Sequence, residues 1–457
     1  MAKLLREDEG EPEGAPAAGA GPGETPAGPR APSGRAALYG NAIFVWINQA
    51  GTGLAGFLFW ALAARLYDTN EVGLGSAAFS ILTLLCMVST LGLGLALIRY
   101  YPEAGAAGPR LMNAVFTWNA VAGVVAAALF LAAVPVAVPK LDFLFDEVFY
   151  APLFVVFVVA GTLSIVQTQA FISVRKGQFI MVQVLFIQIT RLALAVVMAG
   201  AFGIVASGGL GYLLGGSIGS LLLTRAVPGF RPRLLFDRSA LMKLLPFSMA
   251  NYVANFLVLA PALLLPALVV GLIGEDEAAF FYVAWFVGYL PMSFATSLGT
   301  ALFAEGSYDP AALRALSRRA LMGGLRIAVV SAVLLLLLAN VILLAFGDKY
   351  ADEGATLLRI MAVAGLPAAA VNVYLGALRV MKRNWELVVI HSLIAAVTVV
   401  LSIALLPTVG VEGAGIAHLS GQLLGLGIVV WRLMSTVDGS VRERVRGLFA
   451  SFARTQA

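Results

Sequence analysis

Long apolar stretches, separated by short polar connectors, fill almost the whole chain after residue 36. Twelve of them come close to the roughly 20 residues that an α-helix needs to cross a bilayer. The expected spans are 37–64, 73–98, 112–135, 151–173, 179–203, 207–225, 242–272, 279–303, 321–346, 355–379, 386–406 and 411–433. The pattern predicts an all-α integral membrane protein with about 12 transmembrane helices.

Composition agrees with this fold class. The mean hydropathy is +0.92 and charged residues make up 12% of the chain, far from the values of soluble globular proteins. A soluble enzyme is therefore excluded. The pI near 9.3 does not indicate nucleic-acid binding, because the basic residues are dispersed beside span ends, where anionic lipid accounts for them.

The two ends of the chain differ from its apolar body. Residues 1–36 are rich in Pro, Gly, Ala and Glu and show no apolar periodicity, which predicts a disordered cytoplasmic tail. This segment does not have the pattern of a cleavable signal peptide, because the first apolar stretch starts late and runs into further spans. We expect residues 434–457 to form a second cytoplasmic tail. Cys86, the single cysteine, is expected to be a small core residue.

The basic residues predict the orientation of the chain. On alternate sides of the twelve-span arrangement, 24 Lys and Arg residues lie on the side that includes both termini and four lie on the other. The remaining two, Arg191 and Arg326, fall within spans. Because Lys and Arg concentrate in cytoplasmic loops, both termini should be cytoplasmic.

An internal repeat divides the chain into two halves. A shift of 205 residues places Leu93–Leu97 on Leu298–Leu302, and a shift of 207 places Arg175-Lys176 on Lys382-Arg383. Halves of six spans enter the membrane in the same direction, so they form a parallel repeat of two lobes around a central cavity. The expected parts are a tail (1–36), an N-lobe (37–228), a connector (229–241), a C-lobe (242–433) and a tail (434–457).

Motifs of catalysis are nearly absent. The chain has no phosphate-binding loop and no helical pair of metal ligands, and its two histidines, His391 and His418, lie far apart in sequence. The segment Gly215–Gly219 matches a nucleophile elbow, but it lies within a glycine-spaced membrane helix, not in a turn between a strand and a helix. We therefore predict no catalytic residue, no metal and no cofactor.

Arg191 is the most informative single residue. It falls near the middle of the span 179–203, where a guanidinium is costly and should face protein or a wet cavity. Gln183 and Gln188 precede it by eight and three residues, which makes a polar helix edge plausible. Two interpretations stay open: a cationic contact for an anionic substrate, or an anchor bonded to neighbouring carbonyls.

The first spans of the two halves each carry a polar face. In the first span, Asn41 and Asn48 are seven residues apart, hence on one face, with Gln49 adjacent. The seventh span, its counterpart by the repeat, carries Asn251 and Asn255 four residues apart. These faces predict either the lining of a shared cavity or hydrogen bonds between helices.

Two arginines border spans and are weaker candidates for substrate binding. Arg65 can pair with Asp68 at i+3, and Arg99 follows the positive-inside rule. No Asp or Glu falls at mid-depth in any span, which disfavours an exporter of cationic drugs that exchanges them for protons or sodium.

Part of the first half resembles a known family. The resemblance lies in Gly40-Asn41 through Ala63-Ala64-Arg65-Leu66-Tyr67, in Glu71-Val72-Gly73, in Ser89-Thr90-Leu91-Gly92-Leu93-Gly94, and in Ile98-Arg99-Tyr100-Tyr101-Pro102-Glu103. These segments resemble the Wzx-like polysaccharide-biosynthesis flippases of the multidrug/oligosaccharidyl-lipid/polysaccharide exporter superfamily. The second half has Ala396 where a shift of 205 would place a counterpart of Arg191, so the chain departs from the peptidoglycan-precursor branch with its several deep arginines.

The resemblance implies a flippase of the cytoplasmic (inner) membrane, not an enzyme. It would move polyprenyl-pyrophosphate-linked oligosaccharides to the outer leaflet by alternating access. It implies a lipid-linked saccharide substrate, contact with membrane lipid, and a polysaccharide polymerase or glycosyltransferases as partners. The alternatives are a drug or metabolite exporter of the same fold and a membrane-embedded glycosyltransferase or ligase. The last would normally carry a large polar external loop, whereas the external connectors expected here are all short.

Overall fold

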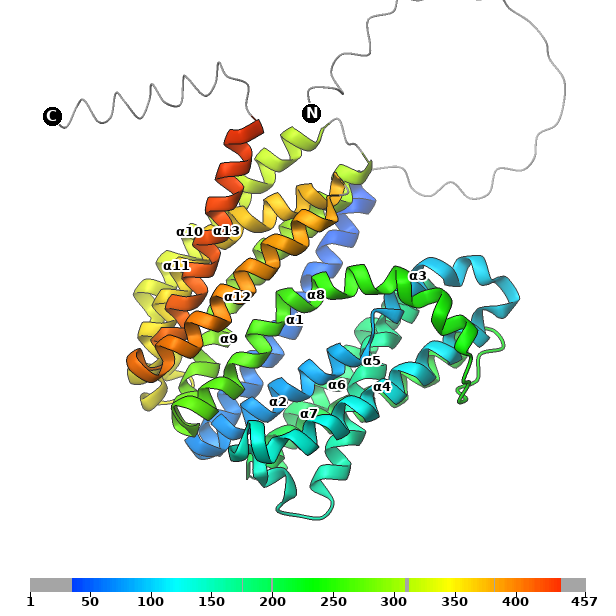
Figure 1. The fold of residues 1–457 in the computed structure, drawn as a ribbon, viewed down its shortest axis with the longest axis horizontal. Helices are drawn as coiled ribbons and strands as arrows, with labels where there is room; N and C mark the ends of the chain where they lie inside the picture. The colour runs from blue at the N-terminus through cyan, green and yellow to red at the C-terminus, as the bar shows by residue number, and fades with distance from the viewer. Residues whose placement is uncertain (1–34, 175, 199, 309–311, 382, 437–457) are drawn as a thin grey trace, which may run out of the picture. The chain divides into compact units, whose positions relative to one another are not determined.

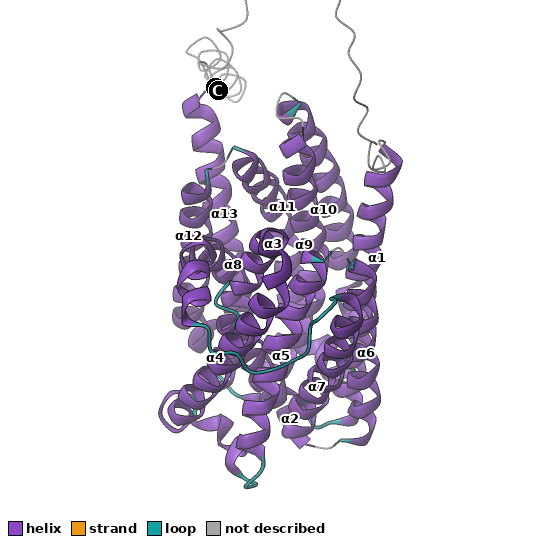
Figure 2. Cartoon of the chain, turned by 90° about the vertical axis from the view of Figure 1, so that its right-hand side faces the viewer, coloured by secondary structure: helices purple, strands orange, loops and turns teal. Residues whose placement is uncertain are grey.

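A computed structural model describes residues 35–174, 176–198, 200–308, 312–381 and 383–436. Within its helices, the side chains at 35–50, 99, 102, 246–247, 249–251, 253–255, 257–260, 300–301, 304–305, 307–308, 384 and 436 lie outside the described part. The described chain contains helices and connecting segments but no strand (Figure 2).

The helices follow one another with short connections (Figure 1). They are α1 (Arg35–Leu66), α2 (Thr69–Ser89), α3 (Leu93–Ala104), α4 (Gly108–Ala137), α5 (Tyr150–Ser173), α6 (Gly177–Val197), α7 (Gly200–Ala226), α8 (Arg238–Leu272), α9 (Glu275–Tyr308), α10 (Leu313–Leu344), α11 (Asp348–Val380), α12 (Asn384–Val409) and α13 (Glu412–Thr436). Two 3-10 segments, Gly105–Ala107 and Pro139–Phe145, flank α4.

The described helices confirm the predicted fold class. Ten of them are long and apolar enough to cross a membrane. The two remaining predicted spans, 37–64 and 242–272, correspond to α1 and α8, whose searched parts include the shorter apolar pieces Gly51–Leu66 and Pro261–Leu272. The chain is a multi-pass membrane protein.

The expected single span 73–98 is wrong, because the helix breaks after Ser89. Leu91 and Gly92 both adopt positive φ, 48° and 67°, and α3 begins at Leu93. A Cβ at Gly92 would lie 2.8 Å from the carbonyl oxygen of Ser248, so α8 packs directly on the break. Tyr252 on α8 donates its hydroxyl to the carbonyl of Val88 at 2.8 Å and so adds a hydrogen bond to the last turn of α2.

The connector between the halves is anchored to α4. Asn113 donates from Nδ2 to the carbonyl of Arg231 and accepts from the backbone N–H of Arg233. One turn later, Thr117 accepts from the backbone N–H of Leu235 at 2.8 Å. These side chains satisfy backbone groups of an extended segment that has no strand partner. The helix that follows starts at Arg238, four residues before the expected span.

Packing inside the two halves follows the repeat. Gly94 on α3 lies against Gln169 of α5, and a Cβ there would approach its side chain to 2.8 Å. Its repeat partner Gly299 on α9 lies against α11, where a Cβ would be 2.5 Å from the carbonyl oxygen of Asn372. Equivalent glycines thus face equivalent helices, which supports the duplication inferred from sequence.

The two halves meet through α1, α2 and α9. A Cβ at Gly73 would overlap the carbonyl oxygen of Glu275, so the α2 and α9 backbones touch. Nearby, the ring centroids of Trp60 and Tyr282 are 4.3 Å apart. Glycine permits this approach because larger side chains would separate the helices.

Candidate functional site

Arg191 lies nearer one end of its helix than the sequence predicts. The structure ends α6 at Val197, whereas the expected span continued to residue 203. At about 1.5 Å rise per residue, Arg191 is ~9 Å from this end and ~21 Å from Gly177. The prediction of a mid-span position is therefore corrected: Arg191 belongs to the last third of α6.

Aromatic rings surround the guanidinium of Arg191. Its Cζ lies 3.7 Å from the ring centroid of Phe59 and 4.4 Å from that of Phe79, with the Trp60 ring at 5.6 Å. Phe59 and Trp60 come from α1 and Phe79 from α2, so two helices supply the rings of this aromatic box and a third, α6, supplies its cation. Each such contact stabilises a desolvated cation by about 2 kcal/mol or more.

The box leaves hydrogen-bond donors of Arg191 unused. Nε and Nη2 are buried and have no acceptor among the described residues. The structure thus gives no support for the alternative in which neighbouring carbonyls bind this side chain at those atoms. A buried cation with free N–H groups matches an anionic ligand, because guanidinium donors fit the oxygens of phosphate in a planar fork.

Gln183, on the same helix, forms a hydrogen bond to a neighbouring helix. Its Nε2 donates to Oε1 of Gln167 on α5 at 2.6 Å, and Gln167 donates in turn to the carbonyl of Gly216 and the hydroxyl of Ser220 on α7. The pair fits because Gly219 has no side chain: a Cβ there would lie 2.4 Å from Gln167 Oε1. This geometry favours a structural role for Gln183.

The remaining predicted site residues fall into two groups. Gln188 is half-buried and donates to the carbonyl of Thr52 on α1 at a long 3.5 Å. Like Arg191, it therefore contacts α1. The side chains of Asn41, Asn48, Gln49, Arg99, Asn251 and Asn255 lie outside the described residues. A cavity lined by these amides stays a prediction.

Arg65 has a different partner from the one expected. Its Nε donates to the carbonyl of Ala345 at 2.8 Å and its Nη2 to that of Leu344 at 3.0 Å. Its expected pairing with Asp68 is not among the ion pairs of the described residues. The reason is that a carbonyl oxygen can accept two hydrogen bonds, so the Leu344 carbonyl accepts from Arg65 as well as from the Gly347 backbone N–H, and the negative end of the α10 dipole attracts a cation.

The sequence did not reveal a polar pocket in the second half. His391 and His418, 27 residues apart, both line it, together with Trp285, Asn372, Thr398 and Gln422. The residues come from four helices, so no local motif marks them. Only the repeat could have drawn attention to this place, because Thr398 lies 207 residues after Arg191.

Comparison with known families gives a match over more than half of the chain. The sequence pattern of the family described as "Polysaccharide biosynthesis protein" matches residues 38–303. The chain belongs to this family. A comparison with curated proteins finds no match.

Solved structures share the fold of this family member. A lipid II flippase MurJ, in an inward closed conformation, aligns with a TM-score of 0.70 at 12% identity, covering 86% of this chain and 87% of that one. An inward-facing multidrug resistance MATE family transporter of the MOP superfamily aligns with a TM-score of 0.66 at 13% identity, covering 84% and 94%. Together with the family match, these likenesses confirm the predicted membership in the flippase and exporter superfamily.

Proposed function

We propose that this protein is a flippase that translocates polyprenyl-pyrophosphate-linked oligosaccharides across the cytoplasmic membrane. The family match to polysaccharide biosynthesis proteins and the fold shared with a lipid II flippase support this proposal. The two six-helix lobes, 37–228 and 242–433, would alternate access to the two leaflets, with both termini in the cytoplasm. Glycosyltransferases would build the saccharide before it crosses the membrane, and a polymerase would act on it afterwards.

One observation carries the proposal at the level of residues: the Arg191 guanidinium is buried with free donors at Nε and Nη2. The pyrophosphate of a lipid-linked saccharide supplies the acceptor oxygens that these N–H groups lack. Phe59 and Phe79, which cover the guanidinium, belong to α1 and α2, whereas Arg191 belongs to α6. Relative movement of these helices would therefore open or close the cation to an anionic head group.

An exporter of drugs or metabolites is the second candidate, because a MATE transporter shares the fold. The two functions differ in what Arg191 would meet. A cationic drug would be repelled by the guanidinium, and an uncharged one would leave the buried positive charge without a counter-charge. The buried arginine therefore favours the anionic lipid substrate. A glycosyltransferase or ligase is the least supported reading, since family and fold are those of transporters.

Transport in vesicles tests the proposal. The full chain would be reconstituted with undecaprenyl-pyrophosphate-N-acetylglucosamine as the probe, and arrival in the outer leaflet would be scored by lectin binding. Arg191→Ala should insert normally and lose most transport. Arg191→Lys should retain part of it, because it keeps the charge and loses the planar fork.

Ethidium efflux in the same vesicles separates the second candidate. Wild-type protein should move the lipid-linked sugar and leave ethidium in place. Efflux of ethidium without movement of the lipid would contradict the flippase function and favour a drug exporter. If Arg191→Ala transports the lipid as well as the wild type at matched abundance, Arg191 does not bind the substrate and has a structural role.

A further inference from the structure

The polar pocket of the second half lies between α8, α9, α11, α12 and α13. Trp285 reaches it from α9, Asn372 from α11, His391 and Thr398 from α12, and His418 from α13. The rings of Trp285 and His418 meet edge to face, with centroids 5.0 Å apart. Four helices thus bring hydrogen-bonding side chains to one pocket, and α8 adds an apolar wall.

Several of these side chains have no partner. Both ring nitrogens of His418, Nε1 of Trp285 and Oγ1 of Thr398 are buried and make no hydrogen bond within the described part of the chain. His418 is 7% exposed and Thr398 is fully buried. Each buried polar group left unpaired costs about 1–3 kcal/mol. Four such atoms around one pocket indicate a site for a polar ligand.

The kind of ligand follows from charge and from the balance of donors and acceptors. No Asp, Glu, Lys or Arg lines the pocket, so neither a cation nor an anion would find an opposite charge. The indole N–H can only donate, whereas a neutral imidazole has one donor and one acceptor, and a hydroxyl can act as both. Grouped hydroxyls, which donate and accept at once, satisfy this mixed set.

We propose that this pocket binds one uncharged sugar unit of the transported saccharide. The inference rests on the proposed function and adds a saccharide contact in the second half to the anion contact at Arg191 in the first. The amides of Asn372 and Gln422 supply further donors and acceptors, and the Trp285 ring supplies an apolar wall against which C–H groups of a sugar can pack.

The repeat explains why the pocket exists in this half. Arg191 on α6 and Thr398 on α12 are 207 residues apart, the offset that also relates the basic pairs before these helices. The flanking packing agrees: Ile187 lies against Gly211 and Gly215 of α7, and Ile394 against Gly421 and Gly425 of α13. Where the first half has a long guanidinium, the second has a short hydroxyl and open space.

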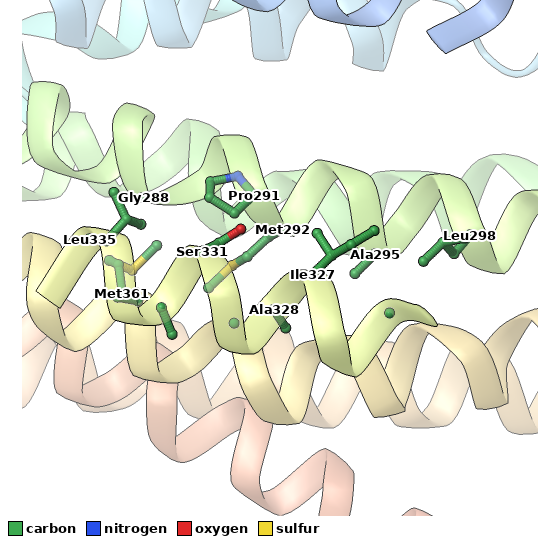
Figure 3. A pocket seen from close by; sticks show the side chains of 14 residues that line it. Gly288, Pro291, Met292, Ala295, Leu298, Ile327, Ala328, Ser331, Leu335 and Met361 are labelled. Carbon is green, nitrogen blue, oxygen red and sulfur yellow. The ribbon is translucent and has the colours of Figure 1, made fainter. Parts of the chain in front are cut away.

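A neighbouring pocket provides a contrast and a control. It lies between α9, α10 and α11, and its lining is apolar except for Ser331 (Figure 3). Met292 lines both pockets, so they are adjacent. An apolar cavity can stay dry, but four unpaired polar atoms require a hydrogen-bonding occupant.

Sugar binding to the purified full-length protein tests the proposal. The protein would be held in a detergent without a sugar head group, and N-acetylglucosamine and glucose would be titrated as probes by saturation-transfer NMR. Thr398→Val removes one hydroxyl with little change of shape, and His418→Phe keeps a ring but removes both nitrogens. Each should weaken binding about five- to tenfold or more, as expected for a lost hydrogen bond of about 1–1.5 kcal/mol.

Matched controls are Thr408→Val, at an exposed hydroxyl on the same helix as Thr398, and Ser331→Ala in the apolar pocket. Both should bind the sugars like the wild type. The proposal is overturned if the wild type binds neither sugar, or if Thr398→Val and His418→Phe, with unfolding temperatures like the wild type, bind as well as it does. Because binding is measured without transport, a flippase that moves the lipid yet binds no free sugar refutes only this inference. Sugar binding without lipid movement refutes only the proposed function.

Discussion

The guanidinium of Arg65, at the end of α1, caps the end of α10 by donating to the carbonyl of Ala345 at 2.8 Å. A second bond runs from Nη2 to the carbonyl of Leu344. The residues are 280 positions apart in the chain, so this contact joins the first half to the second. It acts on carbonyls of the last turn of α10, and the positive charge complements the negative end of the helix dipole.

Arg65→Ala should lower the stability of the folded protein by about 1 kcal/mol, because two hydrogen bonds from an exposed side chain are lost. Arg65→Lys should restore part of this, since it keeps the charge and can form at most one of the two bonds in that geometry. The measurement is the unfolding temperature in detergent. Exposed Arg318, near the start of α10, provides the control, and an equal loss in Arg318→Ala would contradict a specific cap.

Gly219→Ala should destabilise the protein by about 1–3 kcal/mol, the usual cost of overpacking. The new methyl group would lie 2.4 Å from Oε1 of Gln167 and 2.9 Å from Nε2 of Gln183, and would separate the two amides. Thermal unfolding in detergent checks this. Gly427→Ala is the matched control, because a Cβ at Gly427 meets nothing within 4 Å. Similar unfolding temperatures for the two variants would show that the glutamine pair contributes little.

Asp237 should make stability depend on pH. Hydrogen bonds from the Ser239 hydroxyl and the Ala240 backbone N–H, with Arg110 nearby, hold the pKa of this carboxyl below its ordinary value. A lowered folded-state pKa contributes stability above the unfolded pKa of about 3.9, and this is lost as the pH falls through the folded-state value. The difference in unfolding temperature between wild type and Asp237→Asn should therefore be constant near neutrality and shrink below about pH 4. A difference that grows in acid would contradict this sign.

Reporter fusions test the proposed orientation. A fusion after Ala457 should report the cytoplasm and an insertion within Glu275–Glu277 the opposite side, because 24 basic residues lie on one side and four on the other. The pair uses two positions whose expected sides differ, so each is the control of the other. Finding both reporters in one compartment would contradict the twelve-span arrangement.

The sequence alone determined the class of the protein, its apolar helices and its repeat. Apolar length sets transmembrane helices because backbone groups in lipid must bond within the segment, and this holds whatever the neighbours are. The same logic singled out Arg191, since a charge in an apolar stretch is costly regardless of fold. Where local backbone chemistry decided the outcome, as at Leu91 and Gly92, hydropathy missed the break in the span 73–98.

Only the tertiary structure decided which polar groups meet. The aromatic box of Arg191 is built from α1, α2 and α6, and the partner of Arg65 is the end of α10. Gln183 lies eight residues before Arg191 and on the same helix, yet it bonds to Gln167 while the guanidinium keeps its donors free. His391 and His418 are separated along the chain and share one pocket because α12 and α13 lie side by side (Figure 1). Periodicity assigns a residue to a helix face, whereas the packing of other helices against that face decides whether its polar atoms are satisfied or left for a ligand.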